Sequence, residues 1–316
     1  SAELFFLNSP EGPALQKSPD FQLVAVDAPM LVFQSFYGIP DDVFDGAGRS
    51  VNAVLGFTLR LLDLLQKRVH AADARIVICW DESLGSGFRH RLYPPYKANR
   101  PIADEEFIYQ LRRCTEVADS LGLAQCASQE FEADDLIAAL VHRQHEAGQP
   151  ALVVTQDKDL AQIVMPGDTL WAFPKGEPLS HAALLEHWQI PLTSIADYLA
   201  LCGDSVDNIP GAKGIGAVTA RTLLQHFSSL EALYDNLMQV STLPVRGAAA
   251  LQTKLAAQRD EVFLFRQLTR LRHDALTDSQ WLQLICSAAQ PDRLERVLTE
   301  CNLWRRVQKK ASAYFA

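Results

Sequence analysis

The chain has 316 residues, of which 48% are hydrophobic and 21% charged, and this composition is typical of a globular protein with one large or two smaller domains. No run approaches the roughly 20 apolar residues of a membrane span, and no basic, apolar leader is visible, so we expect a cytoplasmic protein. The six cysteines are widely spaced without a C-x-x-C pair, which favours free thiols over a zinc site.

The net charge of −9 at first argues against a nucleic-acid partner. Nine of the 38 acidic residues, however, lie in a few short motifs: Asp27, Asp81, Glu132, Asp134, Asp135, Asp157, Asp159, Asp204 and Asp207. Without those nine, 29 acids remain, which equals the number of lysines and arginines. A single metal site built from these acids would therefore account for the excess negative charge.

In chain order, apolar runs predicted to be strands alternate with segments of helical periodicity. The expected elements are a strand at 21–26, a helix at 51–65, a strand at 75–80, helices at 105–121 and 133–146, and strands at 151–155 and 169–173. This alternation predicts an α/β fold with a central, mostly parallel sheet flanked by helices. From about Pro191 the pattern is mainly helical, with a glycine-rich break at 210–216.

Three of the acids follow predicted strands directly. Asp27, Asp81 and Asp157 each lie at or just past the carboxyl end of a strand, which is the edge where open α/β sheets bind their ligands. Three carboxylates gathered there would repel one another strongly unless cations lay among them. The sequence therefore predicts a cation site at this edge.

Each acid also has an ordinary explanation when it is considered alone. An Asp after a strand commonly serves as a turn residue or helix N-cap, and Glu132 and Asp134 could favour the dipole of the helix that follows them. These local roles do not explain why several acidic motifs fall at strand ends and helix starts of one region. Phosphodiester hydrolysis does explain it, because two Mg²⁺ ions about 3.5–4 Å apart need several oxygen ligands.

Five segments resemble the 5′–3′ exonuclease/flap endonuclease superfamily in order and spacing: VDAPM at 26–30, CWDES at 79–83, FEADD at 131–135, TQDKDL at 155–160 and CGDSVDNIPGAKGIG at 202–216. The likeness runs from about Phe21 to about Leu303 and is strongest to the N-terminal nuclease domain of bacterial DNA polymerase I and its free-standing relatives. It implies a PIN-like 5′ nuclease fold with a C-terminal helix-hairpin-helix (H3TH) region.

The resemblance also implies roles for the nine acids. Asp27, Asp81, Glu132, Asp134 and Asp135 match the first metal site of the family, and Asp157, Asp159, Asp204 and Asp207 match the acids of the second. We expect two Mg²⁺ ions, with Mn²⁺ as a substitute, and Asp27 and Asp134 among the catalytic residues. Two positions depart from the family pattern: Gln34 stands where an Arg is usual, and Ala28 where a Gly is usual.

Basic and aromatic residues alternate along FRHRLYPPYKANR at 88–100, a pattern that suits single-stranded nucleic acid, although a solvated loop would also explain it. YKANR at 96–100 resembles the base of the family's helical gateway, which we expect at about 89–107. Lys97 and Arg100 are then expected to act in catalysis by neutralising the scissile phosphate, with Arg89 as a weaker DNA contact. Phe33, Phe36 and Tyr37 could form a stacking face or pack in the core.

The segment IPGAKGIGAVTARTLLQHF at 209–227 is expected to be the second DNA-binding element. Gly211, Gly214 and Gly216 permit a tight hairpin whose backbone N–H groups can face a phosphate, and the helix that starts at Ala217 adds a favourable dipole. Resemblance to the family places the helix-hairpin-helix at about 197–227 and implies a K⁺ ion there. Lys213 and Arg221 are candidate phosphate contacts, with simple solvation as the alternative.

These observations together predict three regions: a loose extension at 1–20, an α/β catalytic region at 21–190 and a helical DNA-binding region at 191–316. The expected function is hydrolysis of branched or gapped DNA with a 5′ single-stranded end, in replication or repair, by a monomer that binds no membrane. A DNA-structure binder without activity would have lost metal ligands, and none of the nine is lost. A phosphatase for small phosphoesters would need neither the hairpin nor the gateway.

Overall fold

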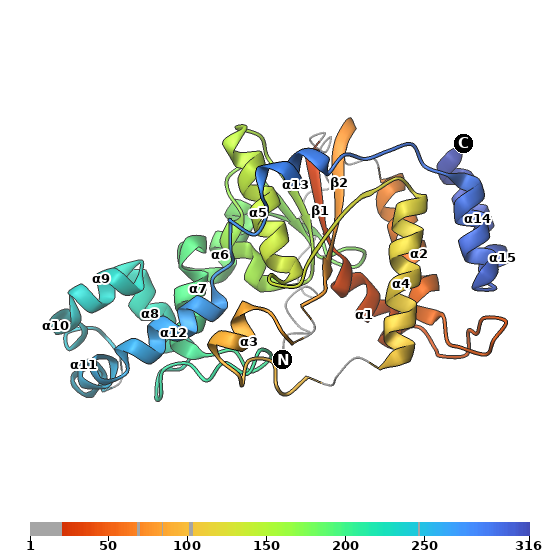
Figure 1. The fold of residues 1–316 in the computed structure, drawn as a ribbon. Helices are drawn as coiled ribbons and strands as arrows, with labels where there is room; N and C mark the ends of the chain where they lie inside the picture. Colours follow the sequence, from red (N-terminus) through yellow and green to blue (C-terminus); the bar gives the residue numbers. More distant parts are fainter. Residues whose placement is uncertain (1–20, 68–69, 84, 101–103, 246) are drawn as a thin grey trace.

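A six-stranded sheet forms the centre of the molecule in the computed structural model, which describes residues 21–67, 70–83, 85–100, 104–245 and 247–316 (Figure 1). The strand order is β3-β2-β1-β4-β5-β6, and every neighbouring pair is parallel except the antiparallel pair β5–β6. The strands are β1 (Phe21–Asp27), β2 (His70–Asp81), β3 (Ala124–Ser128), β4 (Leu152–Val154), β5 (Thr169–Trp171) and β6 (Pro178–Ser180). The predicted α/β fold is confirmed.

Alternation along the strands divides the core between the two faces of the sheet. In β1, Leu23 and Ala25 pack into one cluster while Val24 and Val26 pack into the other, as expected when successive side chains point to opposite faces. The second face is covered by α1 (Ala28–Gly38), α2 (Asn52–Gln66) and α4 (Glu105–Ser120). The first face is covered by α5 (Ala133–Glu146), α6 (His181–Trp188) and α7 (Ile195–Cys202).

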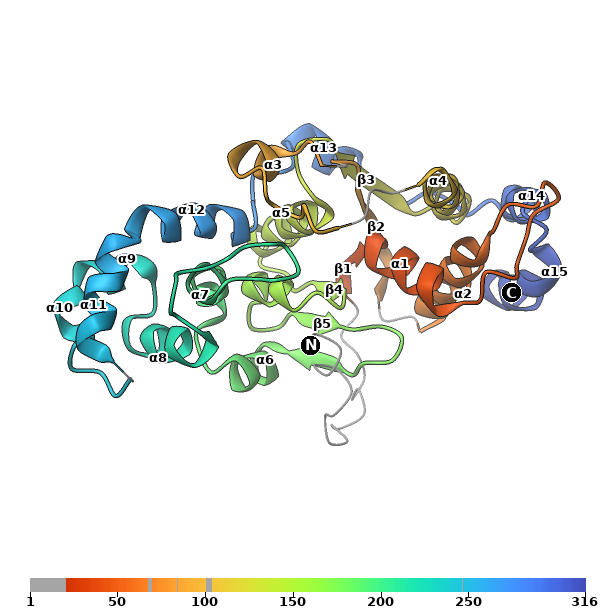
Figure 2. The same cartoon turned by 90° about the horizontal axis from the view of Figure 1, so that it is seen from below.

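A group of helices lies beyond the sheet at one end of the molecule, and Figures 1 and 2 show it from two sides. Its members are α8 (Ala217–Phe227), α9 (Leu230–Asp235), α10 (Leu237–Val240), α11 (Ala248–Ala257) and α12 (Arg259–Thr269). The apolar residues of these helices belong to the same cluster as the first face of the sheet. The core is therefore continuous from the sheet into the helical group.

The last two helices lie at the opposite end (Figure 1). After α13 (Asp278–Gln283), the chain crosses back so that α14 (Pro291–Glu300) packs on α4 and α15 (Trp304–Phe315) packs on α2. Leu294, Leu298 and Val307 are buried there with the second face of the sheet. These residues were expected to continue the helical DNA-binding region, but burial of their apolar stripe places them on the α/β region.

The sequence interpretation missed the strands β3 and β6 and the helices α1 and α6. The segment AQCAS of β3 has neither a β-branched residue nor clear alternation, and β6 has only three residues, so neither carried a strand signal. Helix α1 begins directly at Ala28, with Asp27 as its N-cap and a proline in its first turn. The acid predicted to end a strand therefore also starts a helix.

Candidate functional site

Asp27 lies at the junction of β1 and α1, at the carboxyl edge of the sheet. Its side chain is buried and accepts hydrogen bonds from the Met30 backbone N–H at 3.1 Å and the Thr155 hydroxyl at 2.7 Å. Thr155 follows β4, the strand paired with β1, so the parallel register brings the two residues together. The sequence interpretation missed Thr155, for which the only signal was its position beside Asp157 at the end of the strand.

The start of α5 supplies three more acids. Glu132 is the N-cap, and Asp135 accepts a hydrogen bond from the Glu132 backbone N–H at 3.2 Å, which closes a capping box. Asp134 points from the first turn into a small cavity, and Glu132 also lines it. The acidic motif thus serves both as a helix start and as part of a polar site.

Two further loops bring acids to the same cavity. Asp157 caps the short helix η2 (Lys158–Ile163) by accepting from the Asp159 N–H at 2.8 Å, and both side chains line the cavity. Asp204 and Asp207 reach it from the loop after α7, which closes through paired backbone hydrogen bonds between Asp204 and Ile209. Six of the nine predicted acids line this cavity: Glu132, Asp134, Asp157, Asp159, Asp204 and Asp207.

The electrostatics of this cluster are those of crowded, desolvated carboxylates. Burial raises the pKa of Asp27 to about 6, with Asp157 and Asp81 adding to the shift against the hydrogen bonds from Thr155 and Met30. Burial and neighbouring carboxylates raise the pKa values of Asp134 and Asp159 well above their usual range. A cation among these groups would stabilise their ionised forms.

Asp81 and Glu132 differ from the rest of the cluster. Asp81, at the end of β2, accepts from the backbone N–H and the hydroxyl of Ser83 at 3.0 and 2.7 Å, so its side chain closes a local turn. Burial would raise the pKa of Glu132, but Lys97 and Arg89 beside it hold that pKa at about 2. Glu132 is therefore ionised and paired.

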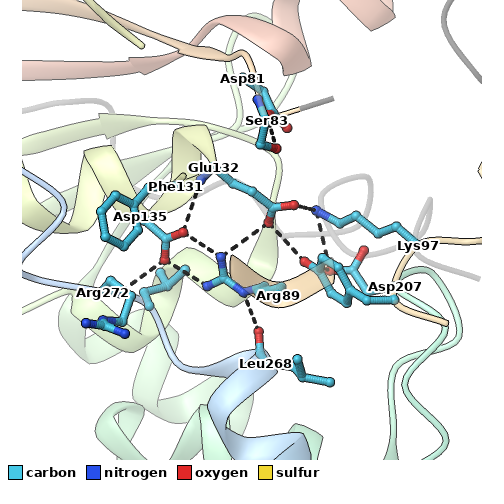
Figure 3. A network of polar contacts seen from close by, with 12 residues as sticks. Asp81, Ser83, Arg89, Lys97, Phe131, Glu132, Asp135, Asp207, Leu268 and Arg272 are labelled. Carbon is cyan, nitrogen blue, oxygen red and sulfur yellow. Dashed lines mark hydrogen bonds and ion pairs between the residues drawn. The ribbon is translucent and has the colours of Figure 1, made fainter. Parts of the chain in front are cut away.

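The predicted cationic residues Lys97 and Arg100 lie directly over the acids. Lys97 Nζ is 2.7 Å from Glu132 Oε1 and 3.8 Å from Asp207 Oδ2, while Arg100 Nη2 is 2.6 Å from Asp207 Oδ1 (Figure 3 shows Lys97). Tyr96, one of the aromatic residues of the 88–100 segment, is buried, and its hydroxyl donates to Glu132 at 2.9 Å and to Asp207 at 3.1 Å. The base of the gateway is thus bound to both acidic loops.

Arg89 lines the inner wall of the cavity and pairs with Asp135, which does not line it (Figure 3 shows the pair). Arg89 is only 3% exposed and binds both carboxylate oxygens of Asp135, which is fully buried. Arg89 was expected to contact DNA and Asp135 to bind metal, yet the structure pairs them with each other. Both side chains are thus occupied by partners within the protein.

The glycine-rich hairpin forms between α7 and α8. Gly211 has a φ of +68°, and a Cβ at this position would lie 2.2 Å from the backbone nitrogen of Gly203, so only glycine fits. Gln258 accepts from the Lys213 backbone N–H at 2.6 Å and donates to its carbonyl at 3.3 Å. The sequence interpretation missed this support because Gln258 lies 45 residues away on the chain.

Three other residues flank the hairpin. Lys254 Nζ, which the sequence interpretation also missed, lies 3.3 Å from the position that a Cβ on Gly214 would take. Gly216 is the N-cap of α8, and Arg221 of that helix has its guanidinium 6.0 Å from the ring centre of Tyr198. Lys213 and Lys254 are exposed, whereas Arg221 is half-buried.

An exposed aromatic face lies on α1, the helix that begins at Ala28. Phe33 and Tyr37 are 44% and 72% exposed, and their rings stack at 6.3 Å. Phe33 also stacks on Phe107 of α4 at 4.8 Å. For Phe33 and Tyr37 the stacking face therefore fits better than core packing, whereas Phe36 packs against the core. Gln34 donates to the Met30 sulfur at 2.9 Å.

The donor set fits hard divalent cations. The six acidic side chains that line the cavity offer carboxylate oxygens, which are the ligands that hard cations prefer. One of these oxygens, Asp159 Oδ1, is buried without a hydrogen-bond partner. Within residues 21–316, apart from the undescribed positions, no group of three or more His, Cys, Asp or Glu side chains stands in an arrangement that would hold an ion. Lys97 and Arg100 lie among the acids instead, so binding of divalent ions would require these ion pairs to rearrange.

Comparisons with known proteins agree with this arrangement. Residues 22–189 match the family model "5′-3′ exonuclease, N-terminal resolvase-like domain", and residues 190–292 match "5′-3′ exonuclease, C-terminal SAM fold". DNA polymerase I of Pseudomonas aeruginosa is 35% identical over 257 residues, which are 81% of this chain and 28% of the relative. The 5′-3′ exonuclease of Buchnera aphidicola is 27% identical over 83% of this chain and 91% of its own length.

Solved structures show the same fold. A T5 5′-exonuclease with bound divalent metal ions superposes with a TM-score of 0.62 at 19% identity, covering 92% of this chain and 99% of its own. The catalytic core of Rad2 in complex with a DNA substrate also gives 0.62, at 16% identity, covering 96% and 95%. This chain spans less than a third of the length of the polymerase relatives.

No helix in the described part of the chain is long and apolar enough to cross a membrane. The match of its first family model to more than half of the chain establishes that this protein belongs to the 5′-3′ exonuclease family.

Proposed function

We propose that the protein is a structure-specific 5′ nuclease that uses two divalent metal ions to hydrolyse phosphodiester bonds in DNA with a 5′ single-stranded end. The observation that carries this proposal is one cavity lined by six carboxylates from three separate segments, two of which, Glu132 and Asp207, pair with the cations Lys97 and Arg100. The proposal is also supported by the 5′-3′ exonuclease of Buchnera aphidicola, because this chain matches 91% of the length of that relative.

The carboxylates and the bound ions would divide the chemistry. When bound, two Mg²⁺ ions would supply an activated water and stabilise charge on the attacking and leaving oxygens. Asp27 and Asp134 would hold them from the sheet edge and the start of α5, while Asp157, Asp159, Asp204 and Asp207 would bind from the opposite loops. The pKa values of four of these acids are raised, which indicates a site that lacks positive charge. The four are Asp27, Asp134, Asp157 and Asp159.

Lys97 and Arg100 would change partners during the reaction. Lys97 forms ion pairs with Glu132 and Asp207, and Arg100 forms one with Asp207. With Glu132 and Asp207 neutralised by bound divalent ions, the Lys97 ammonium and the Arg100 guanidinium would be free to neutralise the scissile phosphate. The positive φ of Lys97, +53°, places this residue in a conformation that its surroundings must hold.

The hairpin and the aromatic face would hold the two ends of the substrate. Backbone N–H groups near Gly214 and Gly216, with Lys213 and Lys254 beside them, suit the phosphates of a duplex arm. Phe33 and Tyr37 offer ring faces to unpaired bases. K⁺ at the hairpin, a monomeric state and a role in replication or repair complete the proposal.

The first test is cleavage of a labelled 5′-flap duplex with Mg²⁺, with EDTA, and with the variants Asp134→Ala and Asp207→Ala. We expect metal-dependent cutting near the flap junction that collapses in both variants and survives in Asp235→Ala, which alters an exposed carboxylate far from the cavity. Flap binding without cleavage in Mg²⁺ and Mn²⁺ would instead support a non-catalytic DNA binder. Turnover of small phosphate esters without DNA cleavage would support a phosphatase.

A further inference from the structure

We infer that Arg89 and Asp135 form a buried positioning pair that fixes the catalytic acids relative to the gateway and the hairpin, and that neither residue contacts DNA or metal. This inference rests on the proposed nuclease function. It changes the roles of one residue expected to bind phosphate and of one expected to bind an ion.

Every nitrogen of the Arg89 guanidinium already has a protein acceptor (Figure 3). Nε donates to the Leu268 carbonyl at 2.7 Å, and Nη2 donates to Asp135 Oδ1 at 2.7 Å and to the Arg270 carbonyl at 3.2 Å. Nη1 donates to Asp135 Oδ2 at 2.5 Å and lies 3.5 Å from Glu132 Oε2. Because the side chain is 3% exposed, no donor remains for a phosphate in solvent.

Asp135 is equally occupied. Each of its oxygens accepts two hydrogen bonds: Oδ1 from Arg89 and the Arg272 backbone N–H at 3.0 Å, and Oδ2 from Arg89 and the Glu132 backbone N–H at 3.2 Å. The carboxylate is fully buried and does not line the acidic cavity, whereas its neighbour Asp134 does. A metal ion could bind Asp135 only if hydrogen bonds from these four donors were broken.

The pair joins three segments that the proposed reaction must keep in register. Arg89 belongs to α3 (Phe88–Leu92) at the base of the gateway, Asp135 to the first turn of α5 with its catalytic acids, and Leu268 to α12. Helix α12 packs on α7, which leads directly into the Asp204 loop and the hairpin. A bidentate guanidinium–carboxylate pair is directional, so it fixes orientation as well as distance.

A second contact holds the gateway to the acidic loop. The Phe88 backbone N–H donates to the Glu130 carbonyl at 3.2 Å, and a Cβ on Gly87 would lie 2.9 Å from that same oxygen. The start of helix α3 is therefore in direct backbone contact with the loop that precedes α5. From α3 the Arg89 side chain extends past this loop to Asp135. Duplex held by the hairpin would accordingly be placed at a fixed position relative to Glu132 and Asp134.

The test compares Arg89→Gln, Arg89→Lys and Asp135→Asn with the wild type and with two reference variants, Lys213→Gln for DNA contact and Asp134→Asn for metal binding. Flap affinity is measured in Ca²⁺ across a salt series, Mn²⁺ binding by calorimetry, and the single-turnover cleavage rate at saturating DNA and Mg²⁺. We expect the Arg89 and Asp135 variants to lose about 10–100-fold in rate. Their flap affinity, salt slope and Mn²⁺ binding should stay within about twofold of wild type, because protein acceptors take the Arg89 donors and Asp135 does not line the cavity.

Two results would overturn the inference. A salt slope that falls by about one in Arg89→Gln, as expected for Lys213→Gln, would make Arg89 a phosphate contact. Asp135 would be a metal ligand if Asp135→Asn lost a bound Mn²⁺ ion, or bound Mn²⁺ with a tenfold lower affinity, as is expected for Asp134→Asn.

Folding is controlled separately. The fraction folded is measured for each variant by circular dichroism, and a rate loss that only follows the unfolded fraction would reduce the pair to a structural role. If Arg89→Gln does not fold, Arg89→Lys and Asp135→Asn retain a polar group and still decide the question. If the wild type cleaves no flap, the proposed function fails, while the DNA and Mn²⁺ titrations still test where Arg89 and Asp135 act.

Discussion

Replacing Asp27 by asparagine should stabilise the protein when divalent ions are removed. The amide of asparagine has the shape of the protonated carboxyl, and the Thr155 hydroxyl and Met30 N–H remain available as partners. Burial raises the folded-state pKa of Asp27 from 3.8 to about 6. A carboxyl with a raised pKa contributes stability that is present below its unfolded value and is lost as pH rises through the folded value.

The expected magnitude follows from this shift. A difference of about two pKa units corresponds to about 3 kcal/mol once the carboxylate is fully ionised. Wild type and Asp27→Asn should therefore be equally stable in EDTA near pH 4, and the variant should exceed the wild type by up to about 3 kcal/mol near pH 7.5. Asp45 and Glu132, whose pKa values are lowered to about 2, are common to both proteins and cancel in the difference.

Urea unfolding followed by circular dichroism between pH 4 and 8 measures this difference directly. With Mg²⁺ the order should reverse, because the wild type binds the ion more tightly and ligand binding stabilises the folded state. Asp235→Asn, which alters an exposed carboxylate, serves as the matched control. A wild type that is as stable as the variant in EDTA at pH 7.5 would refute the view of these acids as crowded and under-neutralised.

Three further predictions concern the cations and the hairpin. Lys97→Met removes the ammonium 2.7 Å from Glu132 and should lower the single-turnover cleavage rate about 10²–10³-fold; an unchanged rate would exclude Lys97 from catalysis. Lys254→Ala should lower the salt slope of duplex binding by about one, whereas an unchanged slope would leave Lys254 solvated. Gly211→Ala forces a Cβ to within 2.2 Å of the Gly203 nitrogen at a positive φ, so urea unfolding should show a loss of about 1–3 kcal/mol together with weaker duplex binding; normal stability would contradict this packing.

Much of the fold could be predicted because its signals are local. The apolar runs of β1, β2 and β4 and the periodicity of α2, α4 and α5 appear in the sequence itself. Parallel strands bring their carboxyl ends to one edge, so the meeting of Asp27 with the residues that follow β4 could also be anticipated. The half-polar β3 and the return of α14 and α15 to the sheet lacked such a signal, since only burial against distant helices explains them.

The sequence by itself determined the set of acids, their order and, for Asp27, Asp81 and Asp157, the strand that each one follows. Only the tertiary structure decided their partners. Arg89 lies 46 residues from Asp135 and 179 from Leu268, yet burial brings all three within hydrogen-bond distance. Adjacent acids of one motif thus face different surroundings: Asp134 faces the cavity, and Asp135 faces a guanidinium. Spacing along a helix fixes which direction a side chain takes, but the charge that meets it there comes from the packing of distant segments.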